Sequence, residues 1–157
     1  MSRRDQIRMT DDELRDFLTS SQTMIINSIN KDGTPHPMPM WYGLEPDGAV
    51  VMTTFTKSQK ILNLERDPRV SLLVEAGTVY SELRGVVIYG RGELIRDVEQ
   101  IVEILTRVST KTLANPDDNT RDGIRKAVRG TAPKRTGIRI HPEKIVSWDH
   151  SKLGGVY

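Results

Sequence analysis

The chain has 157 residues, of which 36% are hydrophobic and 28% are charged, and its formal net charge is +2. This length suits one domain with a hydrophobic core, and the scattered basic residues lack the concentrated face that nucleic-acid binding requires. Cysteine is absent, which excludes disulfides and thiolate chemistry, and no apolar run is long enough for a membrane span. We therefore expect a single cytoplasmic domain over 1–157, with 1–9 as a flexible N-terminal segment.

The first predicted elements are a short helix and a β-hairpin. Thr10 and Glu13 have the spacing of a capping box, which predicts that a helix begins here. Residues 23–30 have the composition of a strand, and Lys31-Asp32-Gly33 is typical of a hairpin turn. The chain is therefore expected to fold back on itself immediately after this strand.

The returning segment, 34–43, carries prolines at every second position. Pro35, Pro37 and Pro39 share one face of an extended strand and remove three backbone donors. An ordinary central strand cannot tolerate this, so an edge strand is predicted. Two interpretations fit: a proline-rich edge strand with Trp41 in the core, or a rigid strand against which a flat cofactor lies.

The rest of the chain alternates strands and helices, with His141-Pro142 predicted as a turn between the last two strands. Short connections between strands favour an antiparallel barrel or sandwich over a doubly wound sheet, so the fold class is mainly β with inserted helices. Strands are predicted over 49–55, 69–76, 84–95, 134–140 and 144–148, and helices over 58–66, 97–113 and 121–129.

The stretch TTFTKSQK, residues 53–60, joins a predicted strand to a predicted helix. A helix N-terminus offers free N–H groups and a partial positive charge, which bind anions. Basic residues are normally unfavourable at this end of a helix, yet Lys57 and Lys60 are both there. The alternatives are a phosphate site and a solvated turn with Ser58 as a plain N-cap.

Side-chain chemistry alone gives no complete active site. The three histidines lack metal-ligand spacing, and the sequence has no G-x-S-x-G nucleophile elbow. An enzyme with this sequence would depend on a bound cofactor. The C-terminal cluster Ser147-Trp148-Asp149-His150-Ser151-Lys152 is either a docked tail or the completion of a site, in this subunit or a neighbouring one.

The motifs NKDGTPHPMPMWY, TTFTKSQKILNLERDPRVSLLVE and IHPEKIVSWDHSKLGGVY occur in a characteristic order. In this order the chain, from residue 10 to 157, resembles the pyridoxamine 5'-phosphate oxidase-like split β-barrel superfamily. Within that superfamily it is similar to small actinobacterial flavin/deazaflavin oxidoreductases. The resemblance implies a six-stranded antiparallel Greek-key split barrel that forms a homodimer, with two cofactor sites at the dimer interface.

The resemblance also assigns residues to parts of the cofactor, with no metal ligand and no catalytic residue. One strand flanks the ring, a strand end lies beneath it, a turn holds the phosphate, and the partner subunit contributes C-terminal residues. The strand residues that flank the ring are His36, Pro37, Met38, Pro39, Met40 and Trp41, and those beneath the ring are Met52, Thr53 and Thr54. The phosphate is held by Thr56, Lys57, Ser58 and Lys60, and the partner subunit contributes Trp148 and Lys152.

The chain ends in KLGGVY, whereas vitamin-B6 oxidases of this superfamily carry a basic C-terminal segment that grips the substrate. The resemblance therefore favours a reductase that uses coenzyme F-420, a deazaflavin, and passes hydride to a conjugated, electron-poor small molecule. The alternatives are an FMN-dependent oxidoreductase and a non-catalytic protein that binds a flavin, a deazaflavin or a tetrapyrrole.

Overall fold

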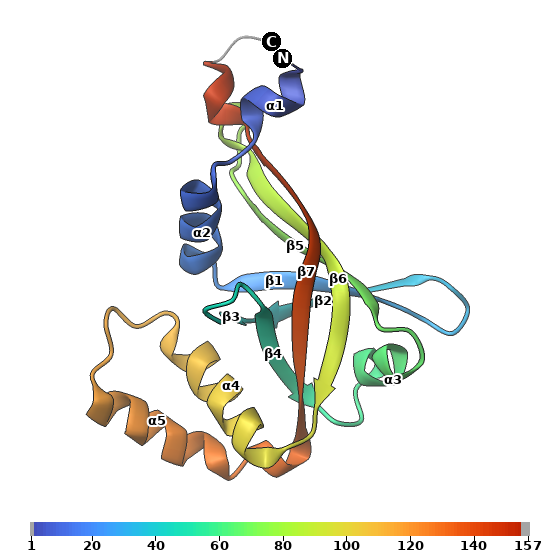
Figure 1. Ribbon diagram of the computed structural model, residues 1–157, viewed down its shortest axis with the longest axis vertical. Coiled ribbons are helices and arrows are strands. Elements are labelled where there is room, and N and C mark those ends of the chain that lie inside the picture. Colours follow the sequence, from blue (N-terminus) through green and yellow to red (C-terminus); the bar gives the residue numbers. More distant parts are fainter. Residues whose placement is uncertain (1, 155–157) are drawn as a thin grey trace.

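The structure is a computed structural model that describes residues 2–154. Its centre is a curled antiparallel sheet of seven strands in the order β2-β1-β5-β6-β7-β4-β3 (Figure 1). The mainly-β antiparallel fold expected from the sequence is confirmed. The strands are β1 Thr23–Ile29, β2 Pro35–Trp41, β3 Gly43–Leu44, β4 Val50–Phe55, β5 Arg69–Ala76, β6 Arg84–Ile95 and β7 Arg135–Asp149.

Within residues 2–154, five α-helices and three short 3-10 helices surround the sheet. The capping box is confirmed, because the Glu13 amide donates to Thr10 Oγ1 and the Thr10 amide donates to the Glu13 carboxylate. No helix within residues 2–154 is long and apolar enough to cross a membrane. The helices are α1 Arg3–Ile7, α2 Asp11–Ser20, α3 Gln59–Arg66, α4 Val98–Thr110 and α5 Asp118–Arg129, with η1 Tyr80–Glu82, η2 Ala132–Lys134 and η3 His150–Leu153.

Two hydrophobic cores lie on opposite faces of the sheet, and β4 contributes to both. Val50 and Met52 are fully buried in the core enclosed by the curled sheet, whereas Val51 joins the core beneath α4. Alternate residues of a strand point to opposite faces, so a continuous apolar run is what a strand covered on both sides requires. Helix α5 packs on α4 at the outside of the molecule (Figure 1).

The predicted strands 69–76 and 84–95 are found with the same bounds, but the predicted turn at His141-Pro142 is wrong. The chain continues there as one strand, β7. Opposite this point the register with β6 shifts between Tyr89 and Gly90, so Glu143 is left without a partner. This bulge accommodates the proline in a continuous strand. The sheet has seven strands rather than six because the two-residue strand β3 joins its edge.

The proline-rich strand β2 lies at one edge of the sheet, as predicted. Trp41 at its end is 61% exposed, so of the two interpretations the one that places Trp41 in the core is wrong. The described part of segment 1–9 contains α1 and the buried Met9, whose amide donates to Ser147 Oγ at 3.1 Å. The N-terminal residues are thereby attached to the end of β7.

Candidate functional site

The candidate site is the N-terminal end of α3 with the turn before it, residues 54–60, where the chain leaves β4 and enters the helix. We call this region the α3 mouth. Ser58 is the N-cap residue and has extended backbone angles, but its side chain makes no capping hydrogen bond. The backbone amides of Gln59 and Lys60 donate to no acceptor within residues 2–154. The sequence prediction of a helix starting near residue 58 is confirmed, and free donors at this end are available to an anion.

Lys60 is buried at this helix mouth. Its side chain is almost fully enclosed, with the residue 6% exposed, and Nζ donates to Thr54 Oγ1 at 3.3 Å. Burial lowers the pKa of Lys60, and no carboxylate of the described residues lies within ion-pair distance of its ammonium group. A buried cation without a counterion is unfavourable, so this position attracts a bound anion.

Hydroxyl groups gather around the same turn. Thr54 Oγ1 lies 3.3 Å from Ser58 Oγ, and Thr136 Oγ1 lies 3.1 Å from Thr56 Oγ1. Thr136 is directly opposite Thr54 in the β4–β7 pairing. Hydroxyls both donate and accept, so these four side chains can exchange their mutual hydrogen bonds for bonds to a ligand.

Arg135 lies at the same end of the β4–β7 pair but on the opposite face of the sheet from Thr54 and Thr136, and sequence reasoning did not single it out. It faces Phe55 in the β4–β7 pairing, and its guanidinium carbon lies 4.8 Å from the centre of the Phe55 ring. Nη1 donates to Thr53 Oγ1 at 3.4 Å, whereas the buried Nε has no partner among the described residues. The only signal in the sequence was a basic residue at the start of a predicted strand, which means nothing until that strand is paired with β4.

Asn63 holds α3 against the β1–β2 hairpin. This fully buried side chain donates to Ser28 Oγ and to Asn30 Oδ1, both at 3.0 Å. Ser28 pairs with His36 of β2, so the same contact relates the helix to the predicted cofactor strand. Of that strand's inner face, His36 is half-buried and Met38 is 37% exposed.

The other predicted residues near the α3 mouth differ in exposure and in hydrogen bonding. Lys57 is exposed and has no hydrogen bond or ion pair within the described part of the chain. Thr53 is half-buried and bonded to Arg135. Met52 is fully enclosed by the inner core, so its side chain does not join the hydroxyl and lysine group.

Trp148 and Lys152 are not brought to α3. They lie at the opposite end of the protomer, where β7 runs into η3 (Figure 1). Trp148 covers Gly85, where a Cβ atom would come within 2.3 Å of the indole ring. Lys152 Nζ donates to the carbonyl of Arg8 at 2.8 Å and pairs with Glu13. Within one chain these two residues therefore belong to a separate region.

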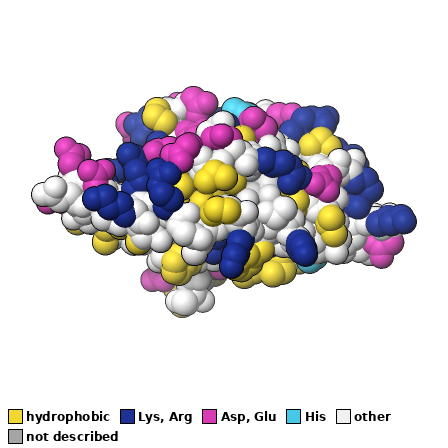
Figure 2. All heavy atoms as spheres, turned by 90° about the horizontal axis from the view of Figure 1, so that it is seen from below, with side chains coloured by type: hydrophobic (Ala, Val, Ile, Leu, Met, Phe, Trp, Pro, Cys, Tyr) yellow, Lys and Arg dark blue, Asp and Glu magenta, His cyan; other side chains and the backbone are white. Residues whose placement is uncertain are grey.

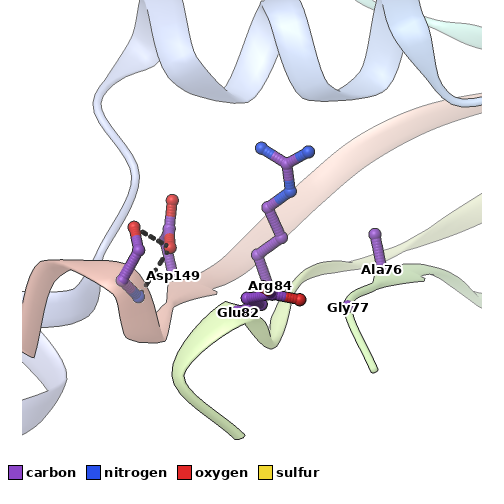
Figure 3. Close-up of a pocket in the computed structure, with 6 residues that line it drawn as sticks. Ala76, Gly77, Glu82, Arg84 and Asp149 are labelled. Carbon is purple, nitrogen blue, oxygen red and sulfur yellow. Dashed lines mark hydrogen bonds between the residues drawn. The ribbon is translucent and has the colours of Figure 1, made fainter. Parts of the chain in front are cut away.

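A cavity of about 280 Å³ at that far end contains none of the predicted cofactor residues (Figure 3). Its lining includes Glu82, Arg84 and Asp149. The Asp149 carboxylate accepts from the amide and the hydroxyl of Ser151 at 3.0 and 2.6 Å, the dashed lines in Figure 3. These bonds cap η3, so Asp149 has a structural role here.

Seen from the α3 end, the surface mixes both signs of charge. Figure 2 shows Lys and Arg side chains interspersed with Asp and Glu and with single hydrophobic side chains. Ion pairs between described residues include Arg96 with Glu65 and Arg69 with Asp67. Lys60 differs from the lysines of this mixed surface because it is buried.

The family model described as pyridoxamine 5'-phosphate oxidase matches residues 10–149. The chain therefore belongs to the pyridoxamine 5'-phosphate oxidase family, and the split-barrel architecture expected from its motifs is confirmed. No match was found among the curated proteins.

Solved structures with the same fold include a conserved hypothetical protein, Rv2991, from Mycobacterium tuberculosis. It is 36% identical, with a TM-score of 0.85, and the alignment covers 100% of this chain and 95% of that one. An F420 reductase is 18% identical, with a TM-score of 0.60 over 83% of this chain and 94% of its own. A FAD-binding protein from Mesorhizobium loti is 22% identical, with a TM-score of 0.64 over 88% and 94%.

Proposed function

We propose that this protein is an oxidoreductase that binds coenzyme F-420 and reduces a conjugated, electron-poor small molecule. The observation that carries the proposal is the buried Lys60 ammonium group at the mouth of α3, which has a hydroxyl partner and no counterion among residues 2–154. A phosphate group supplies the missing charge and accepts hydrogen bonds from the free helix amides.

The cofactor phosphate is assigned to Thr56, Lys57, Ser58 and Lys60. Lys60 provides a fixed charge, because its stem is enclosed by protein, whereas the exposed Lys57 can move toward the ligand. The residues present therefore fit a phosphate-bearing cofactor.

The ring of the cofactor is assigned to the inner face of β2. His36, Met38 and Met40 share this face, and Met40 packs against the inner core. When bound, a deazaflavin supplies hydride transfer, and the protein's task is to orient the reacting partners and exclude water with apolar walls. The thioethers of the methionines form such a wall, and the alternating prolines keep the strand extended.

Support for the deazaflavin comes from the family and from fold relatives. The pyridoxamine 5'-phosphate oxidase family includes oxidoreductases, and an F420 reductase shares the fold. A FAD-binding protein also shares it, which keeps FMN as the alternative cofactor. Fold similarity at these identities does not select between the two, so the choice rests on a binding measurement.

We also propose that the protein works as a homodimer with its sites at the interface. The support is that Trp148 and Lys152 belong to the end of β7 and to η3, away from α3 in their own chain, while the edge strand β2 ends in the exposed Trp41. Sedimentation analysis should give twice the monomer mass. A monomer that binds the cofactor with full affinity would contradict the shared site.

The deciding experiment is a fluorescence titration with F-420 and FMN side by side. We expect saturable binding of F-420 and weaker binding of FMN. Tight FMN binding without F-420 binding would replace the proposal with the FMN-dependent alternative. Reduced cofactor should then be mixed with electron-poor acceptors, because binding without hydride transfer would indicate a non-catalytic binding protein.

A further inference from the structure

A cavity lined by basic residues lies where α2, β3 and the end of α4 meet. It has a volume of about 340 Å³ and is formed by β3, the C-terminal end of α4 and the loop that leads into α5. A cavity of this size accommodates a small molecule. The residues that matter for its chemistry are Gly43, Arg107, Lys111, Asn115 and Arg121.

Three cations line this cavity, and no lining residue is acidic. Arg107 Nη1 donates to the carbonyl of Leu44 at 3.0 Å, and Arg121 Nε donates to the carbonyl of Pro116 at 3.1 Å. Lys111 Nζ donates to the carbonyl of Ser21. Within the described part of the chain, none of the three forms an ion pair.

The neighbouring arginines of α5 are arranged differently. Arg125 pairs with Glu103 at 2.9 Å, and Arg129 pairs with Glu99 at 2.5 Å, both across the α4–α5 contact. Acidic partners are therefore available on α4, but they lie outside the cavity. The cations inside it keep their charge uncompensated, and most of their N–H donors remain available.

Lys111 is the most enclosed of the three. Its Nζ lies 3.2 Å from the centre of the Tyr42 ring, whose hydroxyl donates to the carbonyl of Leu18. The ring and the Ser21 carbonyl favour the charged amine, whereas burial acts against it and lowers the pKa of Lys111 to about 7. An anion in the cavity would stabilise the charged form.

Backbone features shape the cavity around these side chains. A Cβ atom on Gly43 would come within 2.9 Å of Arg107 Cγ, so the arginine lies directly against the β3 backbone. Asn115 has a positive φ of 48°, which turns the loop after α4 so that the chain returns as α5. Asparagine adopts this conformation more readily than most residues.

We propose that this cavity is a binding site for a small molecule that carries at least two oxyanion groups, held by Arg107, Lys111 and Arg121. The guanidinium groups match phosphate and carboxylate oxygens in pairs, and the lysine adds a third charge. The site is built from different elements than the α3 mouth, so it does not depend on the proposed cofactor.

Calorimetric titrations with inorganic pyrophosphate and with citrate test this proposal at constant ionic strength. The titrations use a variant of the protein with Lys57→Gln and Lys60→Gln, which lacks the lysines of the α3 mouth. Binding to this variant therefore reports on the α4–α5 cavity and not on the proposed cofactor site. We expect saturable binding at one site, weakened about tenfold by Arg121→Gln, because one charge-assisted pair of hydrogen bonds is lost. Tighter pyrophosphate binding would assign a phosphorylated ligand, and tighter citrate binding a carboxylate.

The matched control is Lys126→Gln, which removes one exposed positive charge from the same helix and should leave the affinity within about twofold, since surface charge is screened. Arg107→Gln should weaken binding as Arg121→Gln does, and circular dichroism should show that each variant is folded. Absence of saturable binding to both probes, or an equal loss in Lys126→Gln, would overturn the proposal. Unchanged affinity in Arg121→Gln would overturn it as well.

Discussion

Two regions of this molecule place a buried or half-buried lysine among neutral partners, and they differ in how the chain builds them. At the α3 mouth, the donors come from consecutive residues between Thr53 and Lys60 and from the helix backbone itself. In the α4–α5 cavity, Arg107 and Lys111 lie one helical turn apart at the end of α4, and Arg121 joins them only when α5 packs on α4. A backbone-based anion site is thus visible in a short stretch of sequence, whereas a side-chain-based site is not.

The largest expected effect tests the α3 mouth. The double substitution Lys57→Ala with Lys60→Ala should weaken F-420 binding by about 100-fold, because two charge-assisted contacts to the phosphate are removed. Fluorescence titration measures this, and Lys31→Ala, which removes an exposed lysine from the β1–β2 turn, is the control. An unchanged affinity in the double variant would remove the phosphate assignment and, with it, the comparison between two anion sites.

A smaller effect is expected from the contact that positions α3. Asn63→Ala should lower the free energy of unfolding by about 2 kcal/mol, because the buried Ser28 and the half-buried Asn30 lose a donor. Urea denaturation measures the loss, and Asn119→Ala on the exposed side of α5 should leave stability nearly unchanged. A similar result for both variants would show that α3 is held by its hydrophobic contacts alone.

The third prediction concerns Lys111, which faces the Tyr42 ring and shares its cavity with Arg107 and Arg121. Burial lowers the pKa of Lys111 to about 7 in the folded state, whereas the unfolded chain keeps the ordinary lysine value. Above the folded-state pKa, the unfolded chain binds one more proton at Lys111 than the folded chain does. The contribution of Lys111 to the free energy of unfolding therefore rises by up to about 1.4 kcal/mol per pH unit. Lys111→Met should lack this rise.

Urea denaturation of the wild type and of Lys111→Met should be compared near pH 7 and about pH 9, within the window set by the two pKa values. The difference in stability between the two proteins should shift toward the wild type at the higher pH. Parallel pH profiles would mean that the contacts with the Tyr42 ring and the Ser21 carbonyl keep Lys111 charged in the folded state.

The smallest expected effect comes from Gly43→Ala. The added methyl group displaces the flexible Arg107 side chain, so pyrophosphate affinity should fall about threefold while stability changes by less than about 1 kcal/mol. Calorimetry and denaturation measure the two effects, with Gly123→Ala as the control because a Cβ there meets no neighbour. Full affinity in Gly43→Ala would show that the position of Arg107 is unimportant.

Much of the framework was predictable from local patterns. The strands β5 and β6, the start of α3 and the Thr10 cap follow from alternation and capping signals that act within a few residues. The failures occur where a distant segment changes the outcome. The His141-Pro142 turn became part of β7 because β6 supplies a bulged partner, and Trp41 stayed exposed because its strand lies at an edge.

The candidate site shows the same division. The lysines and hydroxyls of residues 53–60 were identified from their order along the chain, but the burial of Lys60 was not, because it depends on the enclosing sheet. Arg135 was missed for the same reason, since it meets Phe55 through pairing between β4 and β7. Met52 was included by its position in the sequence, although the core encloses its side chain.

The sequence by itself determined which segments form strands and helices and where a helix begins with unpaired donors, because hydrophobic periodicity and capping act over a few residues. The tertiary structure decided which charges lose contact with water and which keep a partner. Lys60, Lys111 and Arg135 are ordinary basic residues in the printed sequence. Their environments differ because packing brings together residues far apart in the chain, and burial without a counterion makes a cation a binding group.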